Sequence, residues 1–264
     1  MAAEAKHVLF VHGLWMHSTT WGAWTDLFRE QGFESSAPGW PGDSDTVEET
    51  RKNADRVADH GLDEIVAHHA EATGGLKPIV IGHSFGGLIA ERLLAEGHAS
   101  AAVAIDAAPM KGILYLPPSA LRVASVALRN PANRKRAVSL TKEQFRYGFG
   151  NAVPSAESDG LYERWAIPSP GRPLFEAAFA TFVPNSPAKV ATDQADRGPL
   201  LLTAGGKDHT VPAAVTKQAV KRYRKSQAVT ELKEFPDRGH SLCIDHGWRE
   251  VAESVLDWLR RQNL

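Results

Sequence analysis

The sequence predicts an α/β fold with a mostly parallel sheet that is covered by helices on both faces. Two observations lead to this class: short apolar runs of strand length recur along the chain, and segments with helical spacing lie between them. Continuous apolar runs are typical of strands that are buried on both faces. Strands that alternate with helices favour a parallel sheet. At 264 residues, the chain is long enough for one large domain with a sizeable core.

The predicted strands are the apolar runs at residues 7–11, 79–81, 101–105 and 200–204, together with a last strand at 229–235 before the final helix. Between them, apolar residues recur at the spacing of a helix face. These residues are Trp21, Trp24 and Phe28, then Ile89, Leu93 and Leu94, and finally Trp248, Val251, Val255, Leu256 and Leu259. The alternation of the two patterns is what predicts the layered fold.

A long insertion interrupts this alternation between residues 110 and 194. No strand signal is found there, and prolines divide the stretch into short helical segments such as 119–128, 141–149 and 174–182. The stretch is also rich in aromatic side chains, which are costly to leave exposed together. We therefore predict a helical cap at 110–194 over a core formed by 1–109 and 195–264. The alternative is a surface insertion without a function of its own.

Composition and charge argue against several classes of protein. Lys and Arg number 30 against 31 Asp and Glu, so there is no basic excess for nucleic-acid binding. The single cysteine, Cys243, excludes an intrachain disulfide and argues against a thiolate metal site. No apolar run approaches the roughly 20 residues of a membrane span. Residues 1–7 lack the apolar core of a signal peptide, so we expect a cytoplasmic protein.

Ser84 is the candidate nucleophile. It lies at the centre of Gly82-His83-Ser84-Phe85-Gly86, between a predicted strand and a predicted helix. A sharp turn at this place needs glycine on both sides, because a Cβ atom there would clash with the neighbouring helix and strand. The positive end of the helix dipole would lie beside the hydroxyl. The alternative is a serine that only caps the helix.

A serine hydroxyl needs a general base, and His240 is the candidate among eleven histidines. It lies in a turn between the last predicted strand and the final helix. We expect His12 to have a structural role in the loop after the first strand, and His68 and His69 to be solvated on a polar helix.

A carboxylate must hold the imidazole in the correct tautomer and stabilise the imidazolium. Two aspartates follow predicted strands and are candidates for this role. Asp208 comes shortly after the strand at 200–204, and Asp106 comes directly after the strand at 101–105. Asp106 could instead be a hydrogen-bonded turn residue at the start of the cap.

The chain resembles the α/β-hydrolase superfamily over nearly its whole length. The resemblance rests on His12-Gly13 after the first strand, the pentapeptide around Ser84, Asp208 after a strand, and His240. It implies a mostly parallel α/β-hydrolase sheet with a helical cap inserted after the sixth strand. It also implies a catalytic triad in the chain order Ser84, Asp208, His240, which favours the later of the two carboxylates as the acid.

The resemblance further implies an oxyanion hole and a substrate pocket. The backbone N–H groups of Leu14 and Phe85 are expected to bind the oxyanion of the tetrahedral intermediate. The side chains of Trp15, His209 and Val211 are expected to lie around the pocket of an apolar small-molecule substrate.

These residues predict a serine hydrolase that cleaves a small or medium carboxylic ester through an acyl-enzyme, without a cofactor or metal ion. Serine at the turn argues against epoxide hydrolases and haloalkane dehalogenases, because the resembling families place aspartate there. Lactonases, amidases and carbon–carbon bond hydrolases use the same triad, so they remain alternatives. A noncatalytic ligand receptor on the same fold is another. The cap aromatics could form a dimer surface, so the oligomeric state stays open.

Overall fold

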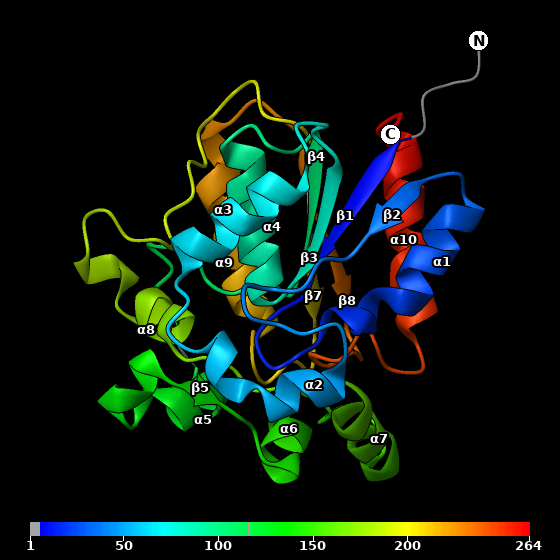
Figure 1. The fold of residues 1–264 in the computed structure, drawn as a ribbon. Helices are drawn as coiled ribbons and strands as arrows, with labels where there is room; N and C mark the ends of the chain where they lie inside the picture. The colour runs from blue at the N-terminus through cyan, green and yellow to red at the C-terminus, as the bar shows by residue number, and fades with distance from the viewer. Residues whose placement is uncertain (1–5, 116) are drawn as a thin grey trace.

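A six-stranded sheet lies at the centre of the computed structural model, which describes residues 6–115 and 117–264 (Figure 1). The strands are β1 (His7–Val11), β2 (Glu34–Ser36), β3 (Ile79–His83), β4 (Ala101–Ile105), β7 (Leu200–Gly205) and β8 (Thr230–Phe235). They are arranged in the order β2-β1-β3-β4-β7-β8, and every neighbouring pair in this sheet is parallel. The predicted parallel sheet is confirmed.

The five predicted strands are all present, with bounds that differ by at most two residues. β3 and β4 are buried at every position, as expected for continuous apolar runs in the middle of a parallel sheet. β2 was not predicted because its residues, Glu34, Ser35 and Ser36, are polar and lie at the edge of the sheet. Four strands of the described sheet precede the long insertion, which therefore follows β4, the fourth in chain order, rather than a sixth.

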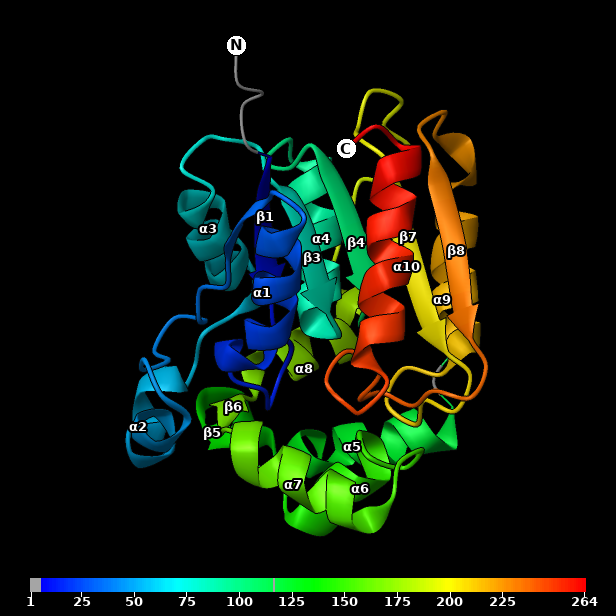
Figure 2. The ribbon, with the colours of Figure 1, turned by 90° about the vertical axis from the view of Figure 1, so that its right-hand side faces the viewer.

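Helices cover both faces of the sheet (Figures 1 and 2). One face is covered by α1 (Gly22–Glu30) and α10 (Trp248–Arg261), and the other by α3 (Leu62–Ala72), α4 (Phe85–Ala95) and α9 (Ala213–Arg222). The shorter elements outside the insertion are α2 (Val47–Lys52), η1 (Ser18–Trp21), η2 (Ala54–Val57) and η5 (Tyr223–Lys225). An aromatic cluster packs β1 against η1 and α1: the ring of Phe10 stacks on Trp21 of η1 at 5.0 Å and meets Phe28 of α1 edge-on at 5.3 Å.

The expectation that His69 is solvated is wrong. His69 lies in α3 with its side chain fully buried, and its Nδ1–H donates to the carbonyl of Ile65 at 2.9 Å. Burial lowers the pKa of His69 to about 3, so this histidine is neutral at physiological pH. The neighbouring polar residues of α3 face solvent, so the sequence pattern did not indicate that position 69 lies on the buried side of the helix.

The helices of residues 110–194 gather beyond the carboxyl ends of the strands (Figures 1 and 2). They are α5 (Pro118–Leu128), η3 (Pro131–Lys135), α6 (Lys142–Gly148), α7 (Ser155–Trp165), α8 (Arg172–Ala178) and η4 (Ala180–Phe182). Although no strand was expected here, β5 (Ala137–Val138) and β6 (Ser169–Pro170) form a short antiparallel pair. Among the described residues, no helix combines the length and the apolar character that crossing a membrane requires.

Candidate active site

Ser84 stands alone between β3, which ends at His83, and α4, which begins at Phe85. Its φ of 57° lies in the left-handed region, which costs energy for a residue with a side chain. Backbone hydrogen bonds hold the turn in place: Ser84 N–H donates to Ile105 O, and Ala108 N–H donates to Ser84 O, both at 2.9 Å. The strained turn is therefore fixed against the end of β4.

Glycine is required on both sides of this turn. A Cβ atom on Gly82 would collide with the backbone carbonyl of Gly86, and a Cβ atom on Gly86 would collide with the carbonyl of Val11 in β1. The turn can thus approach both its own helix and the neighbouring strand. This is the arrangement expected of a nucleophile turn.

His240 and Asp208 form a buried pair whose side chains are fully shielded from solvent. The Nδ1–H of His240 donates to Oδ2 of Asp208 at 2.6 Å. The other oxygen of Asp208 accepts the N–H groups of Thr210 at 2.6 Å and Val211 at 2.8 Å. The carboxylate is therefore held in one orientation, and it holds the imidazole in turn.

The charge of this pair follows from its contacts. Burial alone would raise the pKa of Asp208, but the charge and hydrogen bond of His240, together with the backbone N–H of Val211, bring it below its ordinary value. Asp208 is therefore ionised at neutral pH, as a carboxylate that stabilises an imidazolium must be.

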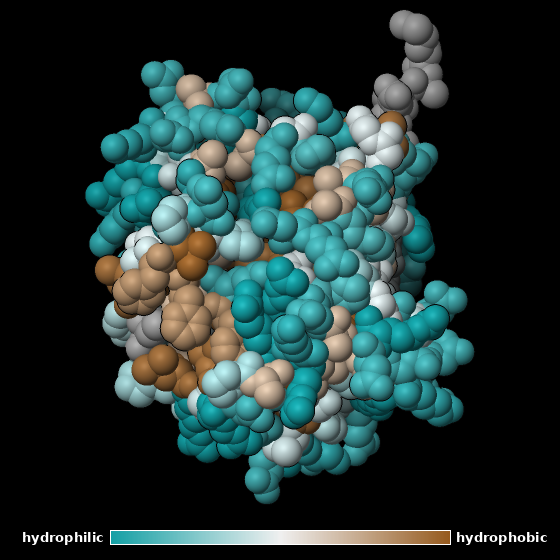
Figure 3. All heavy atoms as spheres, turned by 60° about the vertical axis from the view of Figure 1, so that its left-hand side comes forward, coloured by the Kyte–Doolittle hydropathy of each residue, from teal (hydrophilic) through white to brown (hydrophobic). Residues whose placement is uncertain are grey.

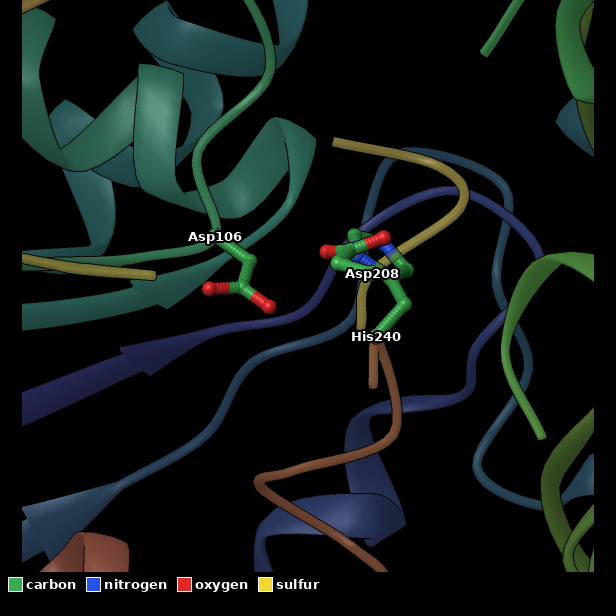
Figure 4. Close-up of side chains that lie close together, drawn as sticks. All are labelled: Asp106, Asp208 and His240. Carbon is green, nitrogen blue, oxygen red and sulfur yellow. The ribbon is translucent and has the colours of Figure 1, made fainter. Parts of the chain in front are cut away.

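Asp106, the other candidate for the acid, is bound differently. Its Oδ1 accepts the N–H of Gly205 at 2.9 Å, and its Oδ2 is buried and has no hydrogen-bond partner in the part of the chain that the structure describes. Burial, followed by the nearby charge of Asp208, raises its pKa well above the ordinary value. Figure 4 shows Asp208 at the imidazole of His240, with Asp106 at the end of β4. Asp106 is thus a neutral neighbour of the pair.

The structure does not join Ser84 to His240 by a hydrogen bond. The Nε2 atom of His240 is buried and has no hydrogen-bond partner among the described residues. His240 nevertheless lies next to the turn, since His83 Nε2–H donates to its carbonyl at 2.9 Å and the two rings are 4.5 Å apart. Catalytic hydrogen bonds are often long before substrate binds, so this separation is compatible with proton transfer.

The loop after β1 packs directly against the nucleophile turn. A Cβ atom on Gly13 would lie 2.7 Å from Ser84 Cβ and 2.8 Å from His83 O. The N–H groups of Leu14 and Phe85 make no backbone hydrogen bond in the described part of the chain. Two N–H groups near one hydroxyl could bind a developing oxyanion.

Trp15 connects this loop to the inserted segment. Its N–H donates to Ser169 Oγ at 2.6 Å, and its indole Nε1–H donates to Val138 O at 3.0 Å. Trp15 also has a positive φ of 65°, so its backbone is held in an unfavourable conformation by these contacts. The short β5–β6 pair, which supplies both acceptors, thereby fixes the loop that carries Leu14.

A cavity of about 270 Å³ opens beside Ser84, Leu14 and Phe85. Trp15 and Val211 are among its lining residues. His209 is not among them, and its expected place at the pocket is corrected: its Nδ1–H donates to the carbonyl of Tyr147 at 3.0 Å, and its ring packs on the Tyr147 ring.

Sequence analysis missed three residues that surround the predicted site. The ring of Phe149, at the end of α6, meets the His240 ring edge-on at 4.7 Å. Ser169 holds Trp15, and Asp43 lies 3.1 Å from His12 Nε2. No local pattern marks these residues, because each acts through a contact distant in sequence.

Two side-chain clusters in the described residues could bring three metal ligands together. In the first, Asp106, Asp208 and His240, the Asp208 carboxylate and the His240 Nδ1 are already paired with each other. In the second, Glu157 pairs with His246, and Asp245 pairs with Arg238. Hydrogen bonds and ion pairs account for both clusters, so we assign neither to a metal ion.

The fold and this site together define a parallel α/β protein with a strained strand-to-helix turn at Ser84, at the carboxyl edge of its sheet. The alpha/beta hydrolase family matches residues 8–254, and the chain belongs to that family. The predicted family is therefore confirmed. No match was found among curated proteins.

Several solved esterase structures share the fold. A methylesterase from Arabidopsis superposes with a TM-score of 0.70 at 18% identity, over 97% of this chain and 99% of that chain. Polyneuridine aldehyde esterase superposes with a TM-score of 0.65 at 21% identity, over 96% of this chain and 99% of that chain. A thermophilic esterase from Thermogutta terrifontis superposes with a TM-score of 0.66 at 17% identity, over 98% of this chain and 91% of that chain. At such low identity, these likenesses concern the fold alone.

Proposed function

We propose that this protein is a serine hydrolase that cleaves carboxylic esters of small or medium size through an acyl-enzyme. The observation that carries the proposal is the buried His240–Asp208 pair, whose ring lies 4.5 Å from the His83 ring next to the strained turn of Ser84 and whose Nε2 has no hydrogen-bond partner among the described residues. A base with one nitrogen oriented by a carboxylate and the other free is what activation of a serine hydroxyl needs.

In the proposed reaction, Ser84 Oγ attacks the ester carbonyl while His240 Nε2 accepts the hydroxyl proton. The N–H groups of Leu14 and Phe85 bind the oxyanion, and Asp208 stabilises the imidazolium. His240 then returns the proton to the leaving alcohol, which leaves an acyl group on Ser84. A water molecule deprotonated by the same nitrogen attacks this acyl group, and the carboxylic acid departs.

Asp208 is the proposed acid because it contacts His240 Nδ1 directly, whereas Asp106 is engaged with Gly205. An ionised carboxylate stabilises an imidazolium, and a neutral carboxylic acid does so far less. The raised pKa of Asp106, caused by its burial, therefore also favours Asp208.

We also propose that residues 110–194 form a cap over a core of 1–109 and 195–264. This division is supported by the position of α5 to α8 beyond the strand ends (Figure 2). Residues 1–5 of the proposed core and position 116 of the proposed cap lie outside the described residues.

Ester hydrolysis is favoured over the other reactions of this triad by the names of the structural neighbours, three of which are esterases. The test is hydrolysis of p-nitrophenyl acetate and butyrate by the wild type and by Ser84→Ala, with matched lactones and amides in parallel. A fluorophosphonate should label Ser84, as read by peptide mass spectrometry. Binding of these compounds without turnover or labelling would instead indicate a receptor.

A further inference from the structure

We infer that the substrate carries an uncharged hydrocarbon chain that lies between α5 and α8, so that hydrolysis becomes more efficient as the chain lengthens. This inference rests on the proposed function. It concerns the part of the substrate that is remote from Ser84 and is argued from the walls and mouth of the cavity.

The walls of the cavity exclude charged groups. None of the described lining residues is charged, and only Ser84, Thr181 and Thr210 carry a hydroxyl group. The hydroxyl of Thr210 already donates to Gly148 O at 2.8 Å. A carboxylate or ammonium group in this space would lose its hydration without gaining a partner, which is strongly unfavourable. An apolar group would gain free energy by leaving water.

Small side chains create the space between the two helices. Ala120 and Ala124 line the cavity from α5, one helical turn apart, and Ala177 and Ala178 line it from α8. The residue types leave room for a chain between the helices, because a larger side chain at any of these positions would occupy it. Ser84 lines the same cavity, so a chain attached to the ester can enter this space from the reacting carbon.

The mouth of the cavity is apolar and open. Leu114, Leu121 and Phe182 line the cavity and are also 72%, 47% and 81% exposed. Figure 3 shows apolar residues gathered on the face of the molecule where α5 and α8 lie. These side chains continue the cavity lining to the surface. A chain too long for the enclosed part therefore still meets apolar surface as it leaves.

The first experiment measures kcat/KM for two ester series. One is p-nitrophenyl esters with acyl chains of two to ten carbons, and the other is acetate esters of alcohols of the same lengths. We expect kcat/KM to rise by about fourfold per methylene in one series, which corresponds to the roughly 0.8 kcal/mol of burying a methylene. The series that rises identifies the side of the ester that holds the chain. A flat response in both, or a preference for chains ending in a charge, would overturn the inference.

The second experiment fills the cavity. Ala124→Phe should abolish the preference for the decanoyl over the acetyl ester. Ser125→Phe is the matched control, because Ser125 is exposed, does not line the cavity and should leave the preference unchanged. Leu114→Glu places a charge at the exposed mouth without disturbing the core, and should lower kcat/KM for the longest esters most. If the ratio of kcat/KM for the decanoyl ester to that for the acetyl ester were the same in Ala124→Phe and in the control, the hydrocarbon chain would not lie in this cavity.

A third measurement separates this inference from the proposed function. Ser84→Ala is titrated calorimetrically with 1-hexanol, 1-octanol, 1-decanol and 1-dodecanol, with and without Ala124→Phe. Affinity should rise with length and fall with the filled cavity even if no ester is turned over, in which case only the proposed function fails. If hydrolysis depended on Ser84 but not on the length of the hydrocarbon chain, the proposed function would stand and the inference of a hydrocarbon chain on the substrate would be refuted.

Discussion

His240 and His12 are both buried histidines near the turn of Ser84, and each has a carboxylate beside its ring. In His12, Nδ1–H donates to Gly13 O at 2.9 Å, Nε2 lies 3.1 Å from Asp43, and the Trp40 ring stacks on one face. In His240, Nδ1 is engaged by Asp208. Neither Nε2 atom has a partner with hydrogen-bond geometry among the described residues, but only that of His12 lies within ion-pair distance of a carboxylate. A carboxylate beside a histidine therefore does not by itself indicate a base; the surroundings of the second nitrogen distinguish the two sites.

The sharpest test of this comparison replaces each histidine by glutamine. His240→Gln should lower kcat by on the order of 10⁶, the loss measured for the base of a comparable triad. His12→Gln should cost at most about 10²–10³, because His12 acts only through the loop that carries the Leu14 N–H. Steady-state kinetics on p-nitrophenyl butyrate measures both. Losses of the same size would mean that His12 also transfers protons.

The next test compares the two carboxylates near His240. Asp208→Asn should reduce kcat by about 10⁴, because the amide favours the wrong imidazole tautomer. Asp106→Asn should cost much less, since a neutral amide replaces a carboxyl group that is already neutral and can still accept the Gly205 N–H. The same ester assay decides between them. A larger loss for Asp106→Asn would identify Asp106, at the end of β4, as the acid instead.

A smaller effect is expected for the loop that separates His12 from Leu14. Gly13→Ala would push a methyl group against Ser84 and His83, and should lower kcat by about 10²–10³ by displacing an oxyanion donor. Gly22→Ala is the control, because nothing lies within 4 Å of its added Cβ and its backbone is helical. It should leave kcat unchanged and stabilise the fold by roughly 0.4–1 kcal/mol in urea titrations. If kcat were unaltered in Gly13→Ala, the oxyanion would not be bound by the N–H group of this loop.

The smallest effect on activity, but a clear one on stability, is expected for His69. This buried histidine lacks a carboxylate partner, and burial lowers its pKa to about 3. Between pH 6.5 and 3, the unfolded chain binds a proton there that the folded protein does not, so stability falls as the pH falls. The loss from pH 7 to pH 4 should be on the order of 3 kcal/mol.

Urea unfolding of His69→Gln and the wild type at both pH values measures this contribution as a difference. His98→Gln is a suitable control, because His98 is exposed. If His69→Gln retained the full acid sensitivity of the wild type, the neutral state of His69 in the folded protein would be refuted.

The parts of the molecule that could be predicted are those with a strong local signal. β1, β3, β4 and β7 are continuous apolar runs, and the turn at Ser84 is marked by two glycines within five residues, although the carbonyl that requires Gly86 belongs to Val11 of β1. β2 escaped prediction because an edge strand can be polar. The β5–β6 pair consists of only four residues, of which Ser169 lies between two prolines, and it carries no periodicity.

The arrangement of the site could be predicted only in part. The residue types alone did not decide whether Asp106 or Asp208 is the acid, since both follow strands that end at the same edge of the sheet. Both carboxylates are buried, so only the hydrogen bond of Asp208 to His240 separates them. His209 was misplaced because its neighbour Asp208 turns toward His240 while its own ring packs on Tyr147.

The two hydrogen bonds from Trp15 to the β5–β6 pair have a mechanical consequence. Any hinge motion that lifts this part of the insertion breaks both bonds and frees the backbone that positions the Leu14 amide. Admission of a ligand from that side would therefore displace the Leu14 N–H, which we propose as an oxyanion donor, at the moment it is needed. The opposite rim, at Leu114 and Phe182, makes neither of these bonds and can part without disturbing them.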